Sequence, residues 1–401
     1  MIKRSHQRLG GFFLAFVPLL ITACSNDPAT TLASANSELA ENDFISAKLH
    51  LLTYLKEKPD HSDAWLKLAR AELFLGRGPN AESALERAQK SGVPEAEIQD
   101  LFVEALLLQE KTKQAYVAIT HIPSARLQRA FLLRGRAHAI DGDAEKALGS
   151  LAEGLAKYPG DSELLAETAR VHLAQNDIVR AETSAKAALK ANPKSHEALL
   201  VNGDLALAQG RPQQAFDYFA DTLRVWPVSV RALIGRAAAE GDLGRLDVMA
   251  KTLDKINGID EDQPLAGLLR AQLLAKQGKW NDVLQIIKVL GPELSRQPLL
   301  FRLEGEAAYS KGLYERAAKA LQRYVAQRPY DRKAVMLLAQ SQLAVKDPVA
   351  ARETLARFAD SASASPAELR LMAKIALALK LPAASAYEAK AQIPHPAFLA
   401  D

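Results

Sequence analysis

The sequence predicts an all-α solenoid built from helix–turn–helix units about 34 residues long. Three series of residues keep this spacing: Gly210, Gly244, Gly278 and Gly312; Pro159, Pro193 and Pro227; and Ala147, Ala181 and Ala215. A unit of this length cannot bury its own apolar face, so successive units must stack. The chain has 401 residues, more than a usual single core holds, and a solenoid accommodates this length because its core grows lengthwise.

Each recurring position in the unit has a physical role, as residues 196–227 illustrate. Gly203 is the small residue that lets the second helix approach the first, and Gly210 suits the left-handed conformation at a helix end. Phe219 is the large apolar residue of the second helix. Pro227 ends the unit, because proline lacks the N–H that a continuing helix needs.

This pattern resembles the tetratricopeptide repeat (TPR) family. It is clearest at Trp65, Leu68, Ala69, Gly76, Ala81, Leu85 and Ala88, and again at Phe301, Gly305, Gly312, Ala317, Leu321 and Pro329. The resemblance implies a right-handed superhelix of about eleven repeats over residues 32–391, with capping end repeats and a tail at 392–401. It also implies that the first helix of each repeat lines the concave face.

One repeat departs from the pattern. In the third, Val103 replaces the small residue and Glu110 replaces the turn glycine. The step to the fourth repeat is about two residues short, so we expect a local change of superhelical pitch around residues 122–126. Connections at 256–263 and 360–365 are candidate bends.

The first 23 residues are predicted to be a lipoprotein signal peptide. Lys3, Arg4 and Arg8 precede an apolar run over 9–21 that is too short to span a bilayer comfortably. The run ends at residues 21–24, Ile-Thr-Ala-Cys, which resembles the bacterial lipobox.

That resemblance implies cleavage before Cys24, acylation of Cys24, and a lipidated linker over 24–31. Ser25 follows in place of the Asp that resembles an inner-membrane retention signal, so we expect an outer-membrane anchor with the solenoid facing the periplasm. The alternative is an ordinary secretory signal followed by a buried cysteine.

Composition argues against several function classes. The chain has 51 basic and 47 acidic residues, and the three basic residues of the leader account for most of the difference. It therefore has no excess of positive charge with which to bind nucleic acid. Cys24 is the one cysteine, so its acylation would leave no disulfide or thiolate site.

Catalytic motifs are missing from the sequence. It contains no H-E-x-x-H, no phosphate-binding Gly-rich loop with Lys-Ser/Thr, and no G-x-S-x-G. His138 and His172 share the repeat spacing, and we interpret them as core or helix-face residues and not metal ligands. Glu304, Glu306 and Glu315 are interpreted as a solvated face. We therefore predict no catalytic residue, metal or cofactor, and an enzyme is the least favoured function.

The candidate binding residues follow the small position of each first helix, which in the TPR superhelix points into the groove. They are Arg70, Glu104, Arg136, Arg170, Asp204, Gln272, Glu306 and Gln340. Arginines here could hold carboxylates of a protein segment, and a carbohydrate is a further candidate ligand. Two alternatives stay open: an ordinary solvated helix face, or an apolar groove along Leu66, Leu132, Leu200, Ile234, Leu268 and Met336.

A narrower resemblance rests on residues 32–48 and 92–109, which are similar to TPR lipoproteins associated with exosortase/PEP-CTERM systems. Those proteins accompany exopolysaccharide production and surface-protein sorting. The expected function is then a lipid-anchored scaffold that binds protein partners of an envelope export or assembly complex. The alternative is a pilotin-like chaperone for an outer-membrane secretion component.

The lipid anchor can be tested by Cys24→Ala. Because two or more buried acyl chains are needed for stable anchoring, we expect the variant to move from the membrane to the soluble fraction of fractionated cells. A pilotin lacking its lipid should mislocalise its client, whereas the partner of a scaffold should stay in place. Wild-type protein whose intact mass retains the first 23 residues and lacks acyl chains would contradict the prediction.

Overall fold

A computed structural model describes residues 27–261, 263–290 and 297–393. The predicted signal peptide, Cys24 and most of the predicted tail lie outside these ranges. Within them every regular element is a helix, as predicted, and no helix is both long and apolar enough to cross a membrane.

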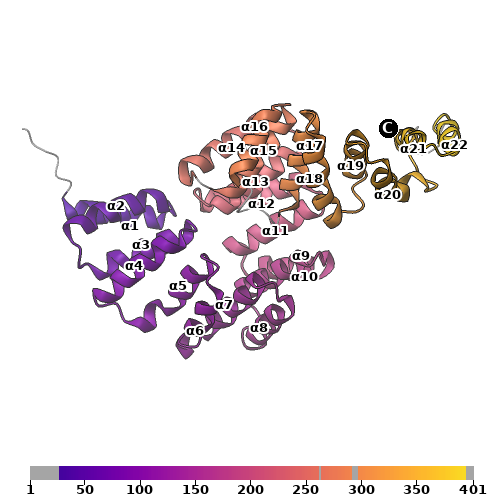
Figure 1. The fold of residues 1–401 in the computed structure, drawn as a ribbon. Coiled ribbons are helices and arrows are strands. Elements are labelled where there is room, and N and C mark those ends of the chain that lie inside the picture. Colours follow the sequence, from indigo (N-terminus) through magenta and orange to yellow (C-terminus); the bar gives the residue numbers. More distant parts are fainter. Residues whose placement is uncertain (1–26, 262, 291–296, 394–401) are drawn as a thin grey trace, which may run out of the picture.

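The helices form eleven consecutive antiparallel pairs, which confirms the predicted repeat number (Figure 1). The first helices are α1 Pro28–Ala40, α3 Ser62–Phe74, α5 Glu95–Leu107, α7 Leu127–Ile140, α9 Ser162–Ala174, α11 His196–Ala208, α13 Val230–Asp242, α15 Pro264–Lys276, α17 Pro298–Ser310, α19 Arg332–Ala344 and α21 Pro366–Ala378. The second helices are α2 Phe44–Glu57, α4 Gly78–Lys90, α6 Thr112–Ile119, α8 Ala144–Lys157, α10 Ile178–Ala191, α12 Pro212–Val225, α14 Leu246–Ile259, α16 Trp280–Leu290, α18 Tyr314–Gln327, α20 Pro348–Ala359 and α22 Ala384–Lys390.

The start of the first repeat differs from the expected boundary, and the end of the third repeat explains its irregular length. Helix α1 begins at Pro28, earlier than residue 32, because proline is well suited to the first turn of a helix. In the irregular third repeat, α6 has only eight residues and a 3₁₀ turn, Ser124–Arg126, follows it. The short helix and the turn lie where the sequence is two residues short.

The turns inside the repeats use the left-handed conformation. Gly210, Gly244, Gly278 and Gly312 have φ between 68° and 75°. Glu110, the substitute in the third repeat, has φ of 54°. The predicted role of these positions is therefore confirmed, and the repeat geometry holds even where the residue type is unfavourable.

In several repeats the core has a small residue of the first helix facing a large one of the second. Phe219 is fully buried, and a Cβ added to Gly203 would lie 2.6 Å from its ring. On the other side of the ring, a Cβ at Gly235 would lie 2.2 Å from it. The two glycines, one on each neighbouring first helix, thus form the slot that holds Phe219. Leu151 against Gly135 and Leu321 against Gly305 repeat the contact.

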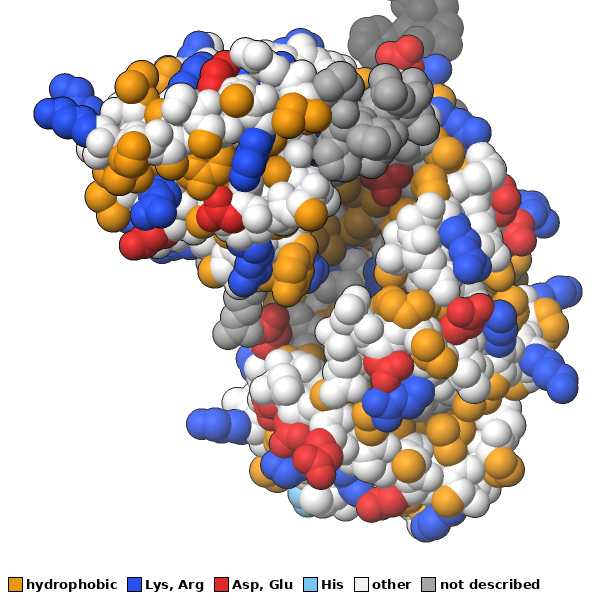
Figure 2. Space-filling view, turned by 90° about the vertical axis from the view of Figure 1, so that its right-hand side faces the viewer, with side chains coloured by type: hydrophobic (Ala, Val, Ile, Leu, Met, Phe, Trp, Pro, Cys, Tyr) orange, Lys and Arg blue, Asp and Glu red, His pale blue; other side chains and the backbone are white. Residues whose placement is uncertain are grey.

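The superhelix curves so strongly that its first two repeats meet its sixth and seventh (Figure 1). The Asn42 side chain donates to the Val225 carbonyl at 3.0 Å, and the Arg77 guanidinium donates to the Ile259 carbonyl at 2.8 Å. Repeats 2 to 7 therefore form a ring, the start of repeat 8 borders it, and the later repeats continue away from it (Figure 1). Figure 2 shows the molecule hollowed between two thick parts, with acidic and basic side chains interspersed on its surface.

The predicted bend at 360–365 is held by side chains from the repeat before it. Arg332 donates through Nε and Nη2 to the two carboxylate oxygens of Glu368 at 2.7 and 2.8 Å, and Nη2 also donates to the Ser363 carbonyl. Ser365 and Glu368 form a reciprocal cap at the start of α21. This connection is consequently fastened to α19.

The slot around Phe219 predicts opposite effects for two glycine substitutions. Gly203→Ala should lower the free energy of unfolding by about 1–3 kcal/mol, because the methyl group would overlap a rigid, enclosed ring. Gly149→Ala should raise it by about 0.5–1 kcal/mol, because Gly149 is a helical glycine with open space around its Cα. Urea unfolding followed by circular dichroism measures both. Equal effects of the two substitutions would contradict the close approach.

Candidate functional site

The ring encloses a cavity of about 870 Å³. Its wall comes from six successive first helices, α3, α5, α7, α9, α11 and α13, with Leu265 at the start of α15 and a few residues of the loops around Ser229 and Gln263. The concave face of the solenoid thus curves around a cavity that stays partly open to solvent over these repeats. A largely preformed concave cavity of this size is typical of binding sites.

One band of the wall is apolar. It contains Phe74, Leu108, Ile140 and Ala174, which follow one another at 34, 32 and 34 residues and so occupy equivalent positions in four repeats. Leu108 and Ile140 expose 44% and 38% of their surface, large fractions for residues of this type. The band therefore offers apolar area that the protein itself leaves unburied.

A second band, one helical turn earlier, is charged. Arg70, Glu104, Arg136 and Arg170 each precede a residue of the apolar band by four positions. Since residues four apart share one face of a helix, the two bands run side by side across the repeats.

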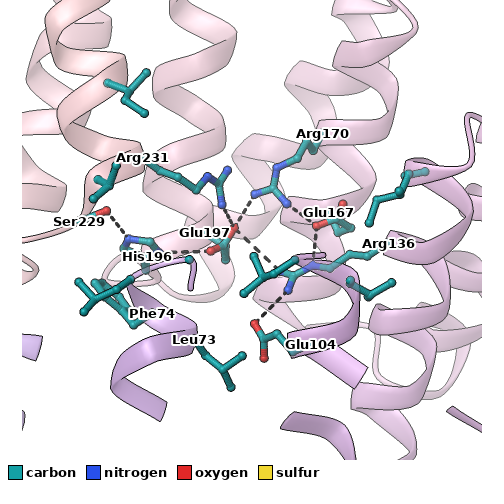
Figure 3. A pocket seen from close by; sticks show the side chains of 18 of the residues that line it. Leu73, Phe74, Glu104, Arg136, Glu167, Arg170, His196, Glu197, Ser229 and Arg231 are labelled. Carbon is teal, nitrogen blue, oxygen red and sulfur yellow. Dashed lines mark hydrogen bonds and ion pairs between the residues drawn. The ribbon is translucent and has the colours of Figure 1, made fainter. Parts of the chain in front are cut away.

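Two arginines of this band, Arg136 and Arg170, are bound to glutamates of neighbouring first helices (Figure 3). Arg136 Nε donates to Glu167 Oε2 at 3.0 Å, and Arg231 Nη1 donates to Glu197 Oε2 at 2.9 Å. Arg170 donates to both Glu167 and Glu197 and so joins the two pairs. These five residues, on four consecutive first helices, form what we call the ion network.

Three further residues, Glu104, Arg129 and Glu163, extend the network along the ring. Arg136 Nη1 lies 3.6 Å from Glu104 Oε1, and Arg129 donates to Glu104 at 2.7 Å and to Glu163 at 3.1 Å. Arg129, Glu163, Glu197 and Arg231 lie 34 residues apart in turn, with basic residues at the ends and acidic residues in the middle. Equivalent positions on adjacent helices therefore carry opposite charges in the first and last steps.

Electrostatics show how strongly the network is bound. Burial alone would raise the pKa of Glu197, but Arg231 and Arg170 outweigh it and hold that pKa well below its ordinary value. The pKa of Glu167 is likewise lowered, because Arg170 and Arg136 outweigh its burial. Burial raises the pKa of Asp204, partly opposed by Arg231 and Arg170. Both glutamates are thus ionised at neutral pH.

The structure brings half of the predicted binding residues together. The cavity is lined by Arg70, Glu104, Arg136 and Arg170. Asp204 lies beside the ion network but does not line the cavity. Gln272, Glu306 and Gln340 lie on α15, α17 and α19, beyond the ring, where Glu306 pairs with Arg302 at 2.9 Å. The arginine roles in partner binding stay a prediction, but Arg136 and Arg170 already hold carboxylates of this chain.

Sequence reasoning missed Glu167, Glu197 and Arg231. Glu167 and Glu197 precede the predicted residues Arg170 and Asp204 on the same helices, and Arg231 lies on α13, where no binding residue was predicted. A search for opposite charges near the repeat spacing would have found them. The proposed apolar groove needs correction: Leu66, Leu132, Leu200 and Leu268 are buried in the core, whereas Ile234 lines the cavity.

The two histidines lie as interpreted, in helix faces. His172 is buried, and burial lowers its pKa, whereas the Tyr116 hydroxyl lies 2.9 Å from Nδ1 of the half-buried His138. No group of three His, Cys, Asp or Glu side chains suited to a metal ion occurs in the part of the chain that the structure describes.

Family models of the tetratricopeptide repeat match residues 38–103, 167–224, 200–264 and 302–366. Together these segments span more than half of the chain. A comparison with curated proteins gave no match.

Three solved structures are among those to which the chain is similar. A tetratricopeptide repeat protein from Parabacteroides merdae ATCC 43184 is 19% identical, with 62% of this chain and 98% of that chain covered and a TM-score of 0.44. Yeast Tom70 is 16% identical, with 92% and 85% covered and a TM-score of 0.41. For pilF of Pseudomonas aeruginosa the values are 16%, 55% and 98%, and 0.42. TM-scores at this level do not bear on function.

The ion network predicts a pH-dependent cost for removing Arg170. Arg170→Met should lower the free energy of unfolding by about 1–3 kcal/mol at pH 7, because Glu167 and Glu197 lose a donor in a largely buried setting. Both glutamates have lowered pKa values, so their stabilisation is present above the ordinary value of about 4.3 and is lost as pH falls below it. The difference between wild type and variant should therefore shrink on acidification.

Urea unfolding at neutral and acidic pH measures this difference. Arg180→Met, which removes a largely exposed arginine paired with Asp177, is the matched control and should change stability by no more than about 0.5 kcal/mol. A pH-independent effect of Arg170→Met would mean that the network is not electrostatically coupled.

Proposed function

Because the chain belongs to the tetratricopeptide repeat family, we propose that it is a lipid-anchored cell-envelope scaffold whose ring holds an apolar segment of a protein partner. Proteins of this family bind protein partners, and their fold is typically a non-enzymatic scaffold. The apolar band on the cavity wall, uncovered beside an ion network that is already paired, carries the proposal.

The pairing decides which band supplies the binding energy. Arg136 and Arg170 already pair with Glu167 and Glu197, so a carboxylate of the partner would compete there with carboxylates of this chain. The apolar band needs no such exchange, and covering it removes apolar surface from water. Leu108 and Ile140 are therefore the contacts on which we expect binding to depend most.

The charged band then fixes the shape of the wall and limits what binds. Arg70 is the exception in the lining, since it is exposed and has no ion pair among the described residues. It suits an acidic or polar group next to the apolar part of the segment. This mixture favours a protein segment over a carbohydrate, which would present hydroxyl groups to the apolar band.

The location of the scaffold rests on the N-terminal sequence. The lipobox ending at Cys24 supports anchoring in the outer membrane with the ring facing the periplasm. The similarity of residues 32–48 and 92–109 to lipoproteins of exosortase/PEP-CTERM systems supports a partner in exopolysaccharide export or surface-protein sorting.

Substitutions in the apolar band test partner binding. Leu108→Asp and Ile140→Asp should each reduce crosslinked capture of the partner from intact envelopes by about tenfold, because a charge there faces the apolar segment. Val179→Asp, on the outer helix α10 and 77% exposed, is the matched control and should leave capture unchanged. Undiminished capture by both cavity variants, with wild-type circular dichroism, would exclude the cavity as the binding site.

A further inference from the structure

The ring is closed by a small set of contacts between repeats that are far apart in the sequence. We call this set the latch. Asn42, Phe44, Phe74, Leu75 and Arg77 form one side of it. The opposite side consists of His196, Val225, Trp226, Val228, Val230 and Ile259.

The two hydrogen bonds of the latch are accepted by backbone carbonyl oxygens at equivalent positions of two repeats. Val225 and Ile259 are the last residues of α12 and α14 and lie 34 residues apart. A carbonyl at the end of a helix has no partner within that helix. Asn42 and Arg77, from the turns of repeats 1 and 2, satisfy these two carbonyls, and a cation at a helix C-terminus is favourable.

Aromatic side chains fill the space between the hydrogen bonds. Phe44 stacks on Phe74 with 4.1 Å between ring centroids, and Phe74 lies 5.3 Å from the His196 ring. His196 in turn meets Trp226 edge-on at 4.9 Å. Leu75 is buried in an apolar cluster with residues of the sixth and seventh repeats, including Val228 and Val230.

The latch and the cavity share side chains. Phe74, Leu75, His196 and Val230 belong to both. His196 also touches the ion network, because its Nδ1 lies 3.2 Å from Glu197 Oε1 and its Nε2 lies 2.9 Å from Ser229 Oγ. A molecule in the cavity therefore contacts the same residues that close the ring.

We propose that the latch is a gate that opens to admit a single polypeptide segment of the partner and closes around it. The proposal rests on the function proposed above and adds how its site is controlled. Consecutive repeats are joined by whole packed helices, whereas the latch joins turns and helix ends through individual side chains. It is thus the part of the ring that separates first, and a folded domain is too large for the cavity behind it.

Accessibility of a cysteine inside the cavity tests the gate. Ala139 lines the cavity, so the full chain with Cys24→Ala and Ala139→Cys carries its one thiol there. The thiol is alkylated with iodoacetamide and, separately, with a maleimide attached to a long polyethylene glycol chain. The latch is weakened by Asn42→Gly with Arg77→Ala; Asn42 has φ of 58°, so glycine keeps its turn.

Weakening the latch should speed the reaction with the bulky maleimide about tenfold and change the iodoacetamide rate by less than about twofold, since removing contacts of the closed state raises the open population. Asn176→Gly is the matched control, because Asn176 occupies the equivalent turn of repeat 5 with φ of 59° and lies outside the latch. It should change neither rate. Val179→Cys on the outer surface should react with both reagents at rates independent of the latch.

An unchanged bulky-reagent rate at Ala139→Cys would overturn the gate, as would an equal increase at Val179→Cys, which would indicate general loosening. The outcome is separate from that of the capture experiment. If the rates respond as expected while Leu108→Asp and Ile140→Asp capture normally, the gate stands and the proposed binding site fails.

Discussion

The close approach of the two helices within each repeat is the constraint on which the rest of the structure depends. In the sixth repeat a small residue on the first helix, Gly203, makes this approach possible opposite the large Phe219 on the second, and Gly235 of the next repeat packs on the same ring. Each repeat buries its apolar face only against the next, so this contact, repeated, sets the path of the superhelix. The ring, its cavity and the approach of repeats 1 and 2 to repeats 6 and 7 all follow from that path.

The ion network illustrates how a binding surface and a structural element can occupy one face. Side chains on the concave side of successive helices are close enough to pair across helices, and in this ring they do so through Arg136, Glu167, Arg170, Glu197 and Arg231. Glutamates of the same chain thereby neutralise the arginines of the concave face. Apolar residues one turn away lie on the cavity wall outside the network and remain exposed.

Much of the fold could be predicted from the sequence, because the 34-residue spacing directly reflects helix packing. The turn glycines and the irregular third repeat each have a cause within a single repeat. The 34-residue spacing, followed along the chain, gives the number of repeats. The candidate site was only partly predictable. Position within the repeat placed Arg136 and Arg170 on the concave face, but their pairing with Glu167 and Glu197 depends on neighbouring helices, and ring closure depends on curvature summed over several repeats. Neither quantity is contained in one repeat.

Ring closure also gives the solenoid a fixed length where such proteins are usually extendable. Inserting or deleting one repeat between the second and the sixth would leave every nearest-neighbour interface intact, yet the carbonyls of Val225 and Ile259 would no longer stand opposite Asn42 and Arg77. The ring therefore requires a fixed number of repeats. Repeats 8 to 11 make no such contact among the described residues, so duplication or loss of a unit there is compatible with an intact ring.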